Sequence, residues 1–228
     1  IEDCAQAIHG TYKGEKLGKF GDLGCFSFHD TKNISAGEGG CLTINKKELY
    51  ERAQYIRDKG TNRKNFIDKL VNKYHWVDQG SSFLMSEINA CFLLHGLKES
   101  EDIHKKRKEV WNTYFELLKP LEDKEKLTIQ KIPRHNTNAA HLFFILVEKK
   151  LRANLINYLR GKGIEATFHY IPLHISPYGS NFYNPKESKL KNSSEFAEKI
   201  IRLPLRANLE RKECEYICSI IHDFFSRN

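Results

Sequence analysis

The sequence FSFHDTKNISAGEGG occupies residues 26–40, and the organisation of the chain can be worked out from it. The apolar run at residues 23–28 predicts a short buried strand that leads into this stretch. The glycines at its end let the backbone approach a bound group closely. Lys32 lies between these two features, where a lysine can serve as an amine nucleophile or a base. By itself, a lysine is more often an ordinary solvated loop residue, so the rest of the chain has to decide.

The composition indicates a globular protein with a sizeable core. The 228 residues are 40% hydrophobic and 11% aromatic, which suits one large domain or two small ones. The 37 Lys and Arg residues against 29 Asp and Glu residues give a net charge of +8, which would suit nucleic acid, an anionic membrane or a phosphorylated small ligand. The basic residues are spread over helix-like segments without a nucleic-acid-binding motif, so we expect no nucleic-acid partner.

Cysteine usage and hydropathy favour a cytoplasmic protein. The six cysteines form no C-x-x-C pair and mostly lie in apolar runs, which is typical of buried free thiols in a reducing compartment. No apolar stretch is long enough to span a bilayer, and no secretory signal pattern is found, so we expect no membrane association.

The periodicity predicts two domains of the α/β class, with a long helix at residues 101–118 at their boundary. Ser86 is expected to cap the buried helix before this boundary. The elements expected before the boundary are strands at 23–28 and 41–44, a helix at 46–59, an extended loop at 61–80 and a buried helix at 86–97. The elements expected after it are strands at 142–147 and 165–171, and helices at 151–159, 193–201 and 210–225.

Four residues of the first part could converge on one ligand. Asp3 and Gln6 follow an apolar start that reads as the end of a strand, Ser27 lies on the next strand, and Lys32 follows five residues later. Sequential strands are often neighbours, so we expect these side chains at one sheet edge. Pyridoxal 5'-phosphate requires such a set: a lysine, a carboxylate for its ring nitrogen, and donors for its phosphate. Taken singly, Asp3 could be a turn residue, Gln6 a surface residue and Ser27 a strand filler.

A second candidate site lies at His169, Tyr170 and His174, at the end of an expected strand. Zinc would need a third ligand that the local sequence does not offer, so we expect no metal. Acid–base or substrate-binding roles fit better, and ordinary surface histidines are the alternative.

Three motifs together resemble the sugar aminotransferases of the DegT/DnrJ/EryC1 family. They are EDCAQ at residues 2–6, SFHDTKN at residues 27–33 and GEGG at residues 37–40. The resemblance implies the α/β fold of aspartate aminotransferase (fold type I) and dependence on pyridoxal 5'-phosphate. It also implies that Asp3 pairs with the pyridine nitrogen, Gln6 lies against the ring, Ser27 binds the phosphate and Lys32 forms the Schiff base.

The resemblance continues to the end of the chain through residues 59–63, 74–78, 80–84, 168–174 and 202–205. These further motifs are most similar to the branch that makes dTDP-4-amino-4,6-dideoxygalactose from a 4-keto-6-deoxy sugar with glutamate as amino donor. The family implies a homodimer, and it implies that His169, Tyr170 and His174 line the sugar side.

The family's chains normally begin well before the first of these motifs, so the chain resembles their C-terminal part. We therefore expect residues 1–100 to be the remainder of the large cofactor-binding domain and residues 101–228 to be the small α/β domain. The absent part would carry a ring stacked on the cofactor and further phosphate donors. The alternative is a noncatalytic member of the same fold that binds a sugar nucleotide or a partner protein.

Overall fold

A computed structural model describes residues 1–184 and 190–227. The chain divides into two compact units. Unit 1 comprises Ile1–His104 with Arg134–Ala139, and unit 2 comprises Lys105–Pro133 with Ala140–Asn228. Among the described residues, no helix has the length and apolar character needed to cross a membrane.

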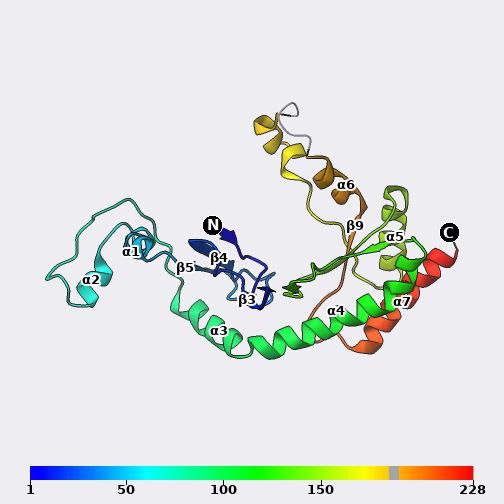
Figure 1. Cartoon of the computed structure of the whole chain (residues 1–228), viewed down its shortest axis with the longest axis horizontal. Helices are drawn as coiled ribbons and strands as arrows, with labels where there is room; N and C mark the ends of the chain where they lie inside the picture. Colours follow the sequence, from blue (N-terminus) through cyan, green and yellow to red (C-terminus); the bar gives the residue numbers. More distant parts are fainter. Residues whose placement is uncertain (185–189, 228) are drawn as a thin grey trace. The chain divides into compact units, whose positions relative to one another are not determined.

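Unit 1 is built on a mixed sheet of three strands, β1 (Glu2–Asp3), β4 (Leu23–Ser27) and β5 (Gly40–Ile44), in the order β1-β4-β5 (Figure 1). β1 is parallel to β4, and β4 is antiparallel to β5. The strands expected from the apolar runs at 23–28 and 41–44 are therefore confirmed. β4 and β5 are joined by the segment that contains Lys32.

A second small sheet of unit 1 has the order β3-β2-β7, formed by β2 (Thr11–Tyr12), β3 (Glu15–Lys16) and β7 (Asn136–Thr137). All its pairs are antiparallel, and the Thr11 and Thr137 hydroxyl oxygens lie 2.5 Å apart. β7 is the reason that residues 134–139 belong to unit 1 although they follow the long helix.

Two helical segments of unit 1 lie where the sequence predicted them, and one of the two differs from the prediction in its burial. The single turn η1 (Lys47–Leu49) leads into α1 (Tyr50–Arg57). α3 (Glu87–Lys98) begins as expected, because the Ser86 hydroxyl accepts a hydrogen bond from the Asn89 N–H at 3.2 Å. The expectation that this helix is buried is wrong for the described chain. None of its residues is buried, and the side chain of Ile88 is 72% exposed.

The segment at residues 61–80 is not a plain loop, because it contains the short helix α2 (Arg63–Ile67). Two contacts hold the beginning of this segment against residues near its end. The Asn62 side-chain oxygen accepts a hydrogen bond from the His75 N–H at 2.6 Å, and Thr61 and Trp76 form an isolated bridge. Such polar bonds have no hydrophobic period, which is why the sequence pattern did not show the helix.

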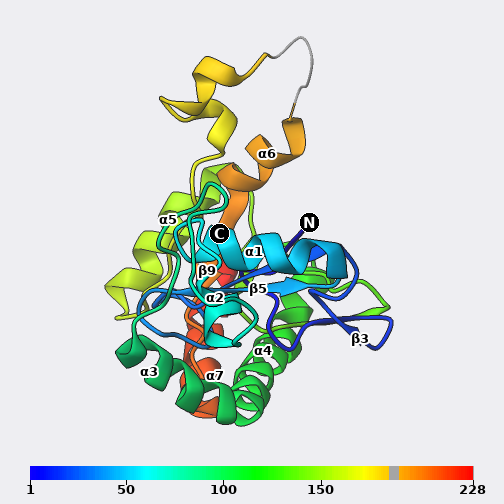
Figure 2. The ribbon, with the colours of Figure 1, turned by 90° about the vertical axis from the view of Figure 1, so that its left-hand side faces the viewer.

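Unit 2 holds a three-stranded antiparallel sheet of β6 (Thr128–Ile129), β8 (Phe143–Leu146) and β9 (Ile200–Leu203), in the order β6-β8-β9. Its helices are α4 (Ser100–Asp123), α5 (Lys149–Gly161), α6 (Lys191–Lys199) and α7 (Arg211–Ser226). The short turns η2 (Leu173–Ile175) and η3 (Gly179–Phe182) lie with α6 beyond the start of β9, on the side away from α7 (Figures 1 and 2).

Three sequence expectations for this unit need correction. α4 continues through Pro120 instead of ending before it, because a proline in the last turn removes only one helical hydrogen bond. The strand expected at 165–171 is reduced to a single bridge between Thr167 and Arg202. Residues 200 and 201 begin β9 instead of ending a helix. The β-branched pair Ile200–Ile201 has no local signal that separates a helix end from a strand start.

The core of unit 2 combines α4, β8, α5, β9 and α7. Alternate residues of β8 are buried, and the helices contribute apolar residues at helical spacing. The fully buried side chains include Tyr114, Phe143, Leu155, Ile201 and Ile221. Each buried CH2 group stabilises a fold by about 0.8 kcal/mol, so this cluster accounts for the compactness of unit 2.

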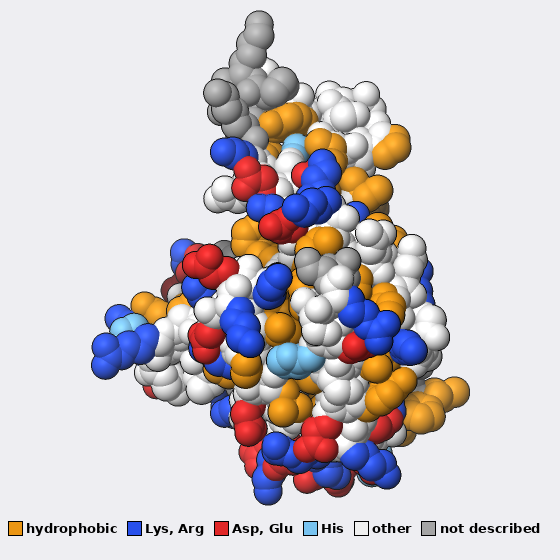
Figure 3. All heavy atoms as spheres, turned by 90° about the vertical axis from the view of Figure 1, so that its right-hand side faces the viewer, with side chains coloured by type: hydrophobic (Ala, Val, Ile, Leu, Met, Phe, Trp, Pro, Cys, Tyr) orange, Lys and Arg blue, Asp and Glu red, His pale blue; other side chains and the backbone are white. Residues whose placement is uncertain are grey.

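The surface carries charges of both signs (Figure 3), and the cysteines are free. On the face drawn in Figure 3, cationic and anionic side chains are interspersed. α7 and the residue that follows it carry ion pairs between Arg211 and Glu215 at 3.0 Å and between Asp223 and Arg227 at 2.8 Å. The six cysteines are free, as expected, but Cys25, Cys41 and Cys91 are exposed.

Candidate active site

The parallel pairing of β1 with β4 brings three of the expected site residues to one sheet edge. Asp3 lies opposite Cys25, and the Cys4 N–H donates to the Cys25 carbonyl at 2.9 Å. Asp3 ends β1, Gln6 is exposed in the turn that follows, and Ser27 ends β4. Because both strands run in the same direction, their carboxyl ends face the same edge.

Asp3 presents an exposed carboxylate at this edge. Its Oδ1 accepts a hydrogen bond from the Ala5 N–H at 3.0 Å, which fixes the side chain over the turn after β1. The residue is exposed, so a ligand can reach this carboxylate. This geometry suits a carboxylate that accepts a hydrogen bond from a protonated ring nitrogen.

Glu2, the neighbour of Asp3, was not expected to contribute. Its carboxylate accepts hydrogen bonds from the backbone N–H groups of Gly18 at 2.8 Å, Phe20 at 2.7 Å and Gly21 at 2.7 Å. These bonds, the one from Gly21 above all, hold the pKa of Glu2 below its ordinary value. The sequence signal for this contact is the pair Gly18 and Gly21, because glycines in a loop allow its backbone to approach a neighbouring strand closely.

Lys32 lies on the loop between β4 and β5 and is partly buried. Its N–H donates to the His29 carbonyl at 3.0 Å, which closes a tight turn. Ile34 and Ala36 are 3% and 5% exposed and belong to a small apolar cluster with Phe28. The loop is therefore anchored directly after Lys32.

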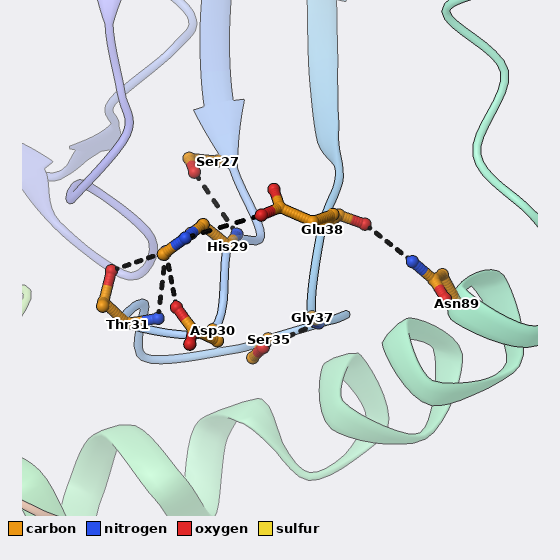
Figure 4. Close-up of polar contacts among 8 residues, drawn as sticks. All are labelled: Ser27, His29, Asp30, Thr31, Ser35, Gly37, Glu38 and Asn89. Carbon is orange, nitrogen blue, oxygen red and sulfur yellow. Dashed lines mark hydrogen bonds and ion pairs between the residues drawn. The ribbon is translucent and has the colours of Figure 1, made fainter.

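Polar contacts around His29 cross the same loop (Figure 4). The His29 Nδ1 atom lies 2.7 Å from the Asp30 carboxylate and 2.9 Å from the Thr31 hydroxyl. The Nε2 atom lies 3.6 Å from the Glu38 carboxylate. These groups are largely exposed, and ion pairs in such positions contribute at most about 1 kcal/mol. The apolar anchor is therefore the stronger restraint.

The glycine segment after Lys32 is closely approached by Met85, a residue of the chain itself. Gly39 has a φ of 154°, and a Cβ atom there would lie 2.3 Å from the Met85 methyl group. In addition, the Phe28 N–H donates to the Gly39 carbonyl at 2.8 Å. A side chain at position 39 would displace either Met85 or the end of the Lys32 loop.

His169, Tyr170 and His174 belong to unit 2. The Nδ1 atom of His169 is buried and has no hydrogen-bond partner among the described residues, and burial, followed by the charge of Arg202, lowers the pKa of its ring. The Tyr170 side chain is 78% exposed, and its ring stands edge-on to that of His169. The Nε2 atom of His174 lies 2.9 Å from the Ser194 hydroxyl.

The residues of unit 1 fit pyridoxal phosphate in donor chemistry. They comprise a carboxylate, a hydroxyl and an amine, and the Lys32 Nζ atom makes no ion pair or hydrogen bond with another described residue. The Ser27 Oγ atom makes only a long contact of 3.4 Å with the His29 N–H, so it is available to a phosphate. In the described residues, no cluster of three His, Cys, Asp or Glu side chains could hold a metal ion.

The family model of the DegT/DnrJ/EryC1/StrS aminotransferases matches residues 1–222, and the chain belongs to this family. Members of the family use pyridoxal phosphate, and the chain has their fold type I α/β architecture, as the sequence predicted. This agrees with the sheet edge and lysine loop described above.

Individual relatives give the extent of the match. GDP-perosamine synthase of Escherichia coli O157:H7 is 28% identical over 231 residues, which are 99% of this chain and 58% of that protein. An uncharacterised protein of Methanocaldococcus jannaschii is 31% identical over 235 residues, covering 100% of this chain and 60% of its own length. The chain thus spans about three-fifths of the length of these relatives.

Solved structures show the same extent. The Helicobacter pylori aminotransferase PseC, which is involved in the biosynthesis of pseudoaminic acid, is similar with a TM-score of 0.86 at 27% identity. The match covers 99% of this chain and 59% of that one. DesV of Streptomyces venezuelae is similar with a TM-score of 0.85 at 25% identity, over 97% of this chain and 56% of its own.

Proposed function

We propose that the protein containing this chain is a pyridoxal-phosphate-dependent aminotransferase acting on a nucleotide-linked keto sugar. The observation that carries the proposal is the sheet edge at which Asp3, Gln6 and Ser27 lie, with Lys32 on the loop that leaves the same strand. Pyridoxal-phosphate chemistry requires this combination of carboxylate, hydroxyl and lysine, each for a different part of the cofactor.

The bound cofactor would supply an aldehyde that condenses with amines and a ring that takes up electrons. Lys32 provides the amine that attaches the cofactor. As a free amine beside the substrate, its Nζ atom would take the proton from the carbon that bears the donor's amino group. Asp3 would keep the ring nitrogen protonated, and the positive charge of that nitrogen would stabilise the negative charge that develops during the reaction.

Ser27 and Gln6 complete the cofactor contacts in this proposal. The Ser27 hydroxyl donates a hydrogen bond to the phosphate, which is a charge-assisted bond and stronger than a neutral one. The Gln6 side chain is exposed at the same edge and would lie against the ring.

His169, Tyr170 and His174 are proposed to bind the sugar. Burial, followed by the charge of Arg202, lowers the pKa of His169 and so favours the neutral ring, in which one nitrogen is a donor and the other an acceptor, although the Nδ1 atom itself is buried. The exposed Tyr170 offers a ring and a hydroxyl to a ligand. The three residues would thus distinguish hydroxyl positions on the sugar.

For the substrate, we propose a 4-keto-6-deoxy sugar, with dTDP-4-amino-4,6-dideoxygalactose as product and glutamate as amino donor. The sequence motifs favour this branch. The names of similar proteins include a GDP-perosamine synthase and a UDP-4-amino-4,6-dideoxy-N-acetyl-beta-L-altrosamine transaminase, so nucleotide and sugar differ among relatives. We also propose a cytoplasmic homodimer.

The decisive experiment uses the full natural protein that contains this chain. Borohydride reduction after addition of pyridoxal phosphate should leave a covalent adduct on Lys32, identified by mass spectrometry. Lys32→Ala should abolish both the adduct and amino transfer, whereas the matched change Lys46→Ala should leave both intact. An adduct on another lysine, or transfer by Lys32→Ala, would refute the assignment.

A panel of nucleotide sugars separates the specific proposal from its alternatives. Amination of dTDP-4-keto-6-deoxyglucose with glutamate, followed by product analysis, supports the specific branch. Amination of only a GDP- or UDP-linked sugar would replace that branch but keep the class. Sugar-nucleotide binding without a Lys32 adduct would favour the noncatalytic alternative.

A further inference from the structure

Asn33 directly follows Lys32. Its side chain makes a hydrogen bond to a residue far away in the sequence. Its Nδ2 atom donates to the carbonyl oxygen of Ala139 at 2.8 Å, across 106 positions of sequence. The contact is partly buried, and Ala139 is only 9% exposed. Both residues belong to unit 1.

This bond adds a restraint between two others on the same loop. Before Lys32, the turn to the His29 carbonyl fixes the backbone, and after it Ile34 is buried in the small apolar cluster. The Asn33 bond ties the residue between them to the Ala139 carbonyl, which follows β7, and β7 is itself paired with β2.

We propose that Asn33 is a positioning residue that sets the direction in which the Lys32 side chain leaves the loop. The inference rests on the proposed role of Lys32 as the amine that holds the cofactor. Misplacing a reacting group by about 1 Å can cost about 100-fold in rate, so a single partly buried bond next to the lysine is sufficient.

A contact between α3 and the other end of the loop provides a control for this bond. The Asn89 Nδ2 atom donates to the Glu38 carbonyl at 3.0 Å, so it is also an asparagine amide on a backbone carbonyl (Figure 4). This contact is exposed and lies six residues beyond Lys32 in sequence. Asn33→Asp and Asn89→Asp therefore make the same chemical change in two contacts of one loop, the first from within the loop and the second from α3. Each keeps the side-chain shape and replaces an amide donor by an acceptor that repels the carbonyl.

The first measurement does not need the cofactor. In the full natural protein without pyridoxal phosphate, limited acetylation followed by mass spectrometry gives the reactivity of Lys32 relative to the exposed Lys46. We expect Asn33→Asp to change this ratio by about threefold or more, because the environment of the amine changes. Asn89→Asp should leave it unchanged.

The second measurement is the rate at which pyridoxal phosphate becomes trapped on Lys32 by borohydride. We expect a fall of about 10- to 100-fold for Asn33→Asp and less than about twofold for Asn89→Asp. Asn33→Ala removes the donor without adding charge, so its trapping rate should lie between the rates of these two variants. Thermal unfolding of each variant shows whether the loss follows stability, and if Asn33→Asp does not fold, Asn33→Ala decides.

Equal effects of Asn33→Asp and Asn89→Asp, or effects of the Asn33 variants that follow their loss of thermal stability, would overturn the proposal. If the wild-type protein forms no adduct on Lys32, the proposed function fails. The acetylation ratio still decides whether Asn33 positions the amine, so the two failures are distinguishable.

Discussion

Asp3 of β1 lies directly opposite Cys25 of β4 in a parallel pair, two residues before Ser27 ends the same strand. This register places a carboxylate and a hydroxyl at one edge of the sheet. The chain beyond Ser27 turns at His29 and presents Lys32. The candidate site therefore depends on the pairing of two short strands.

Asp3→Asn should lower kcat of the full natural protein by about 100-fold or more, because an amide cannot keep a ring nitrogen protonated and the lost electrostatic stabilisation is of that size. Steady-state kinetics with the keto sugar and glutamate measure it. Asp22→Asn, an exposed carboxylate before β4, is the control and should have normal activity. Normal kcat in Asp3→Asn would remove Asp3 from the site.

Ser27→Ala should weaken the binding of pyridoxal phosphate. A hydrogen bond to a charged group contributes about 1.5–3 kcal/mol, so the dissociation constant should rise by about 10-fold or more. Equilibrium titration of the cofactor-free full protein measures this constant. Ser35→Ala removes a hydroxyl whose oxygen only accepts the Gly37 N–H at 2.9 Å, and it should leave the constant unchanged. An unchanged constant for Ser27→Ala would mean that the phosphate binds elsewhere.

His169→Phe should raise KM for the nucleotide sugar by about 10-fold while kcat changes less, since a hydrogen bond made equally in the ground state and transition state acts on KM. Phenylalanine keeps a ring in the half-buried position and removes both nitrogens. His135→Phe changes an exposed histidine and serves as the control. If KM stays at the wild-type value, His169 does not contact the sugar.

Glu2→Gln should destabilise the protein near neutral pH and make its stability less dependent on acid. The folded pKa of Glu2 is below its ordinary value of 4.5, because the carboxylate accepts the N–H groups of Gly21, Gly18 and Phe20. A lowered folded pKa means that the stabilisation is fully present above pH 4.5 and is lost as the pH falls through the folded pKa.

Urea unfolding at pH 7 and at pH 3.5 tests this expectation. The difference in the free energy of unfolding between wild type and Glu2→Gln should be larger at pH 7 than at pH 3.5. Glu48→Gln, an exposed glutamate at the start of η1, should match the wild type at both. A difference that grows on acidification would mean that the folded pKa of Glu2 is raised instead of lowered.

Local sequence patterns predicted many helices and strands of the fold. They did not predict the features that depend on contacts between distant residues. The apolar run before Ser27 and the Ser86 cap identified β4 and the start of α3, because both signals lie within a few residues. No local pattern indicated that α3 is exposed in the described chain, since burial depends on what packs against a helix. Likewise, no local pattern indicated the hydrogen bond between Asn33 and Ala139 or the one between Glu2 and Gly18.

Tyr114→Phe tests how unit 2 is held together. The Tyr114 side chain is 0% exposed, and its hydroxyl donates to the Pro204 carbonyl at 2.8 Å. Burial raises the pKa of Tyr114, so the hydroxyl stays protonated as a donor. Removing it leaves a carbonyl unsatisfied, and we expect a loss of about 1–3 kcal/mol in the free energy of unfolding. Tyr216→Phe is the matched control, because that exposed hydroxyl donates to the Lys162 carbonyl at 3.2 Å, where water can replace it. Chemical unfolding of both variants measures the difference, and equal losses would show that burial of the Tyr114 bond adds nothing.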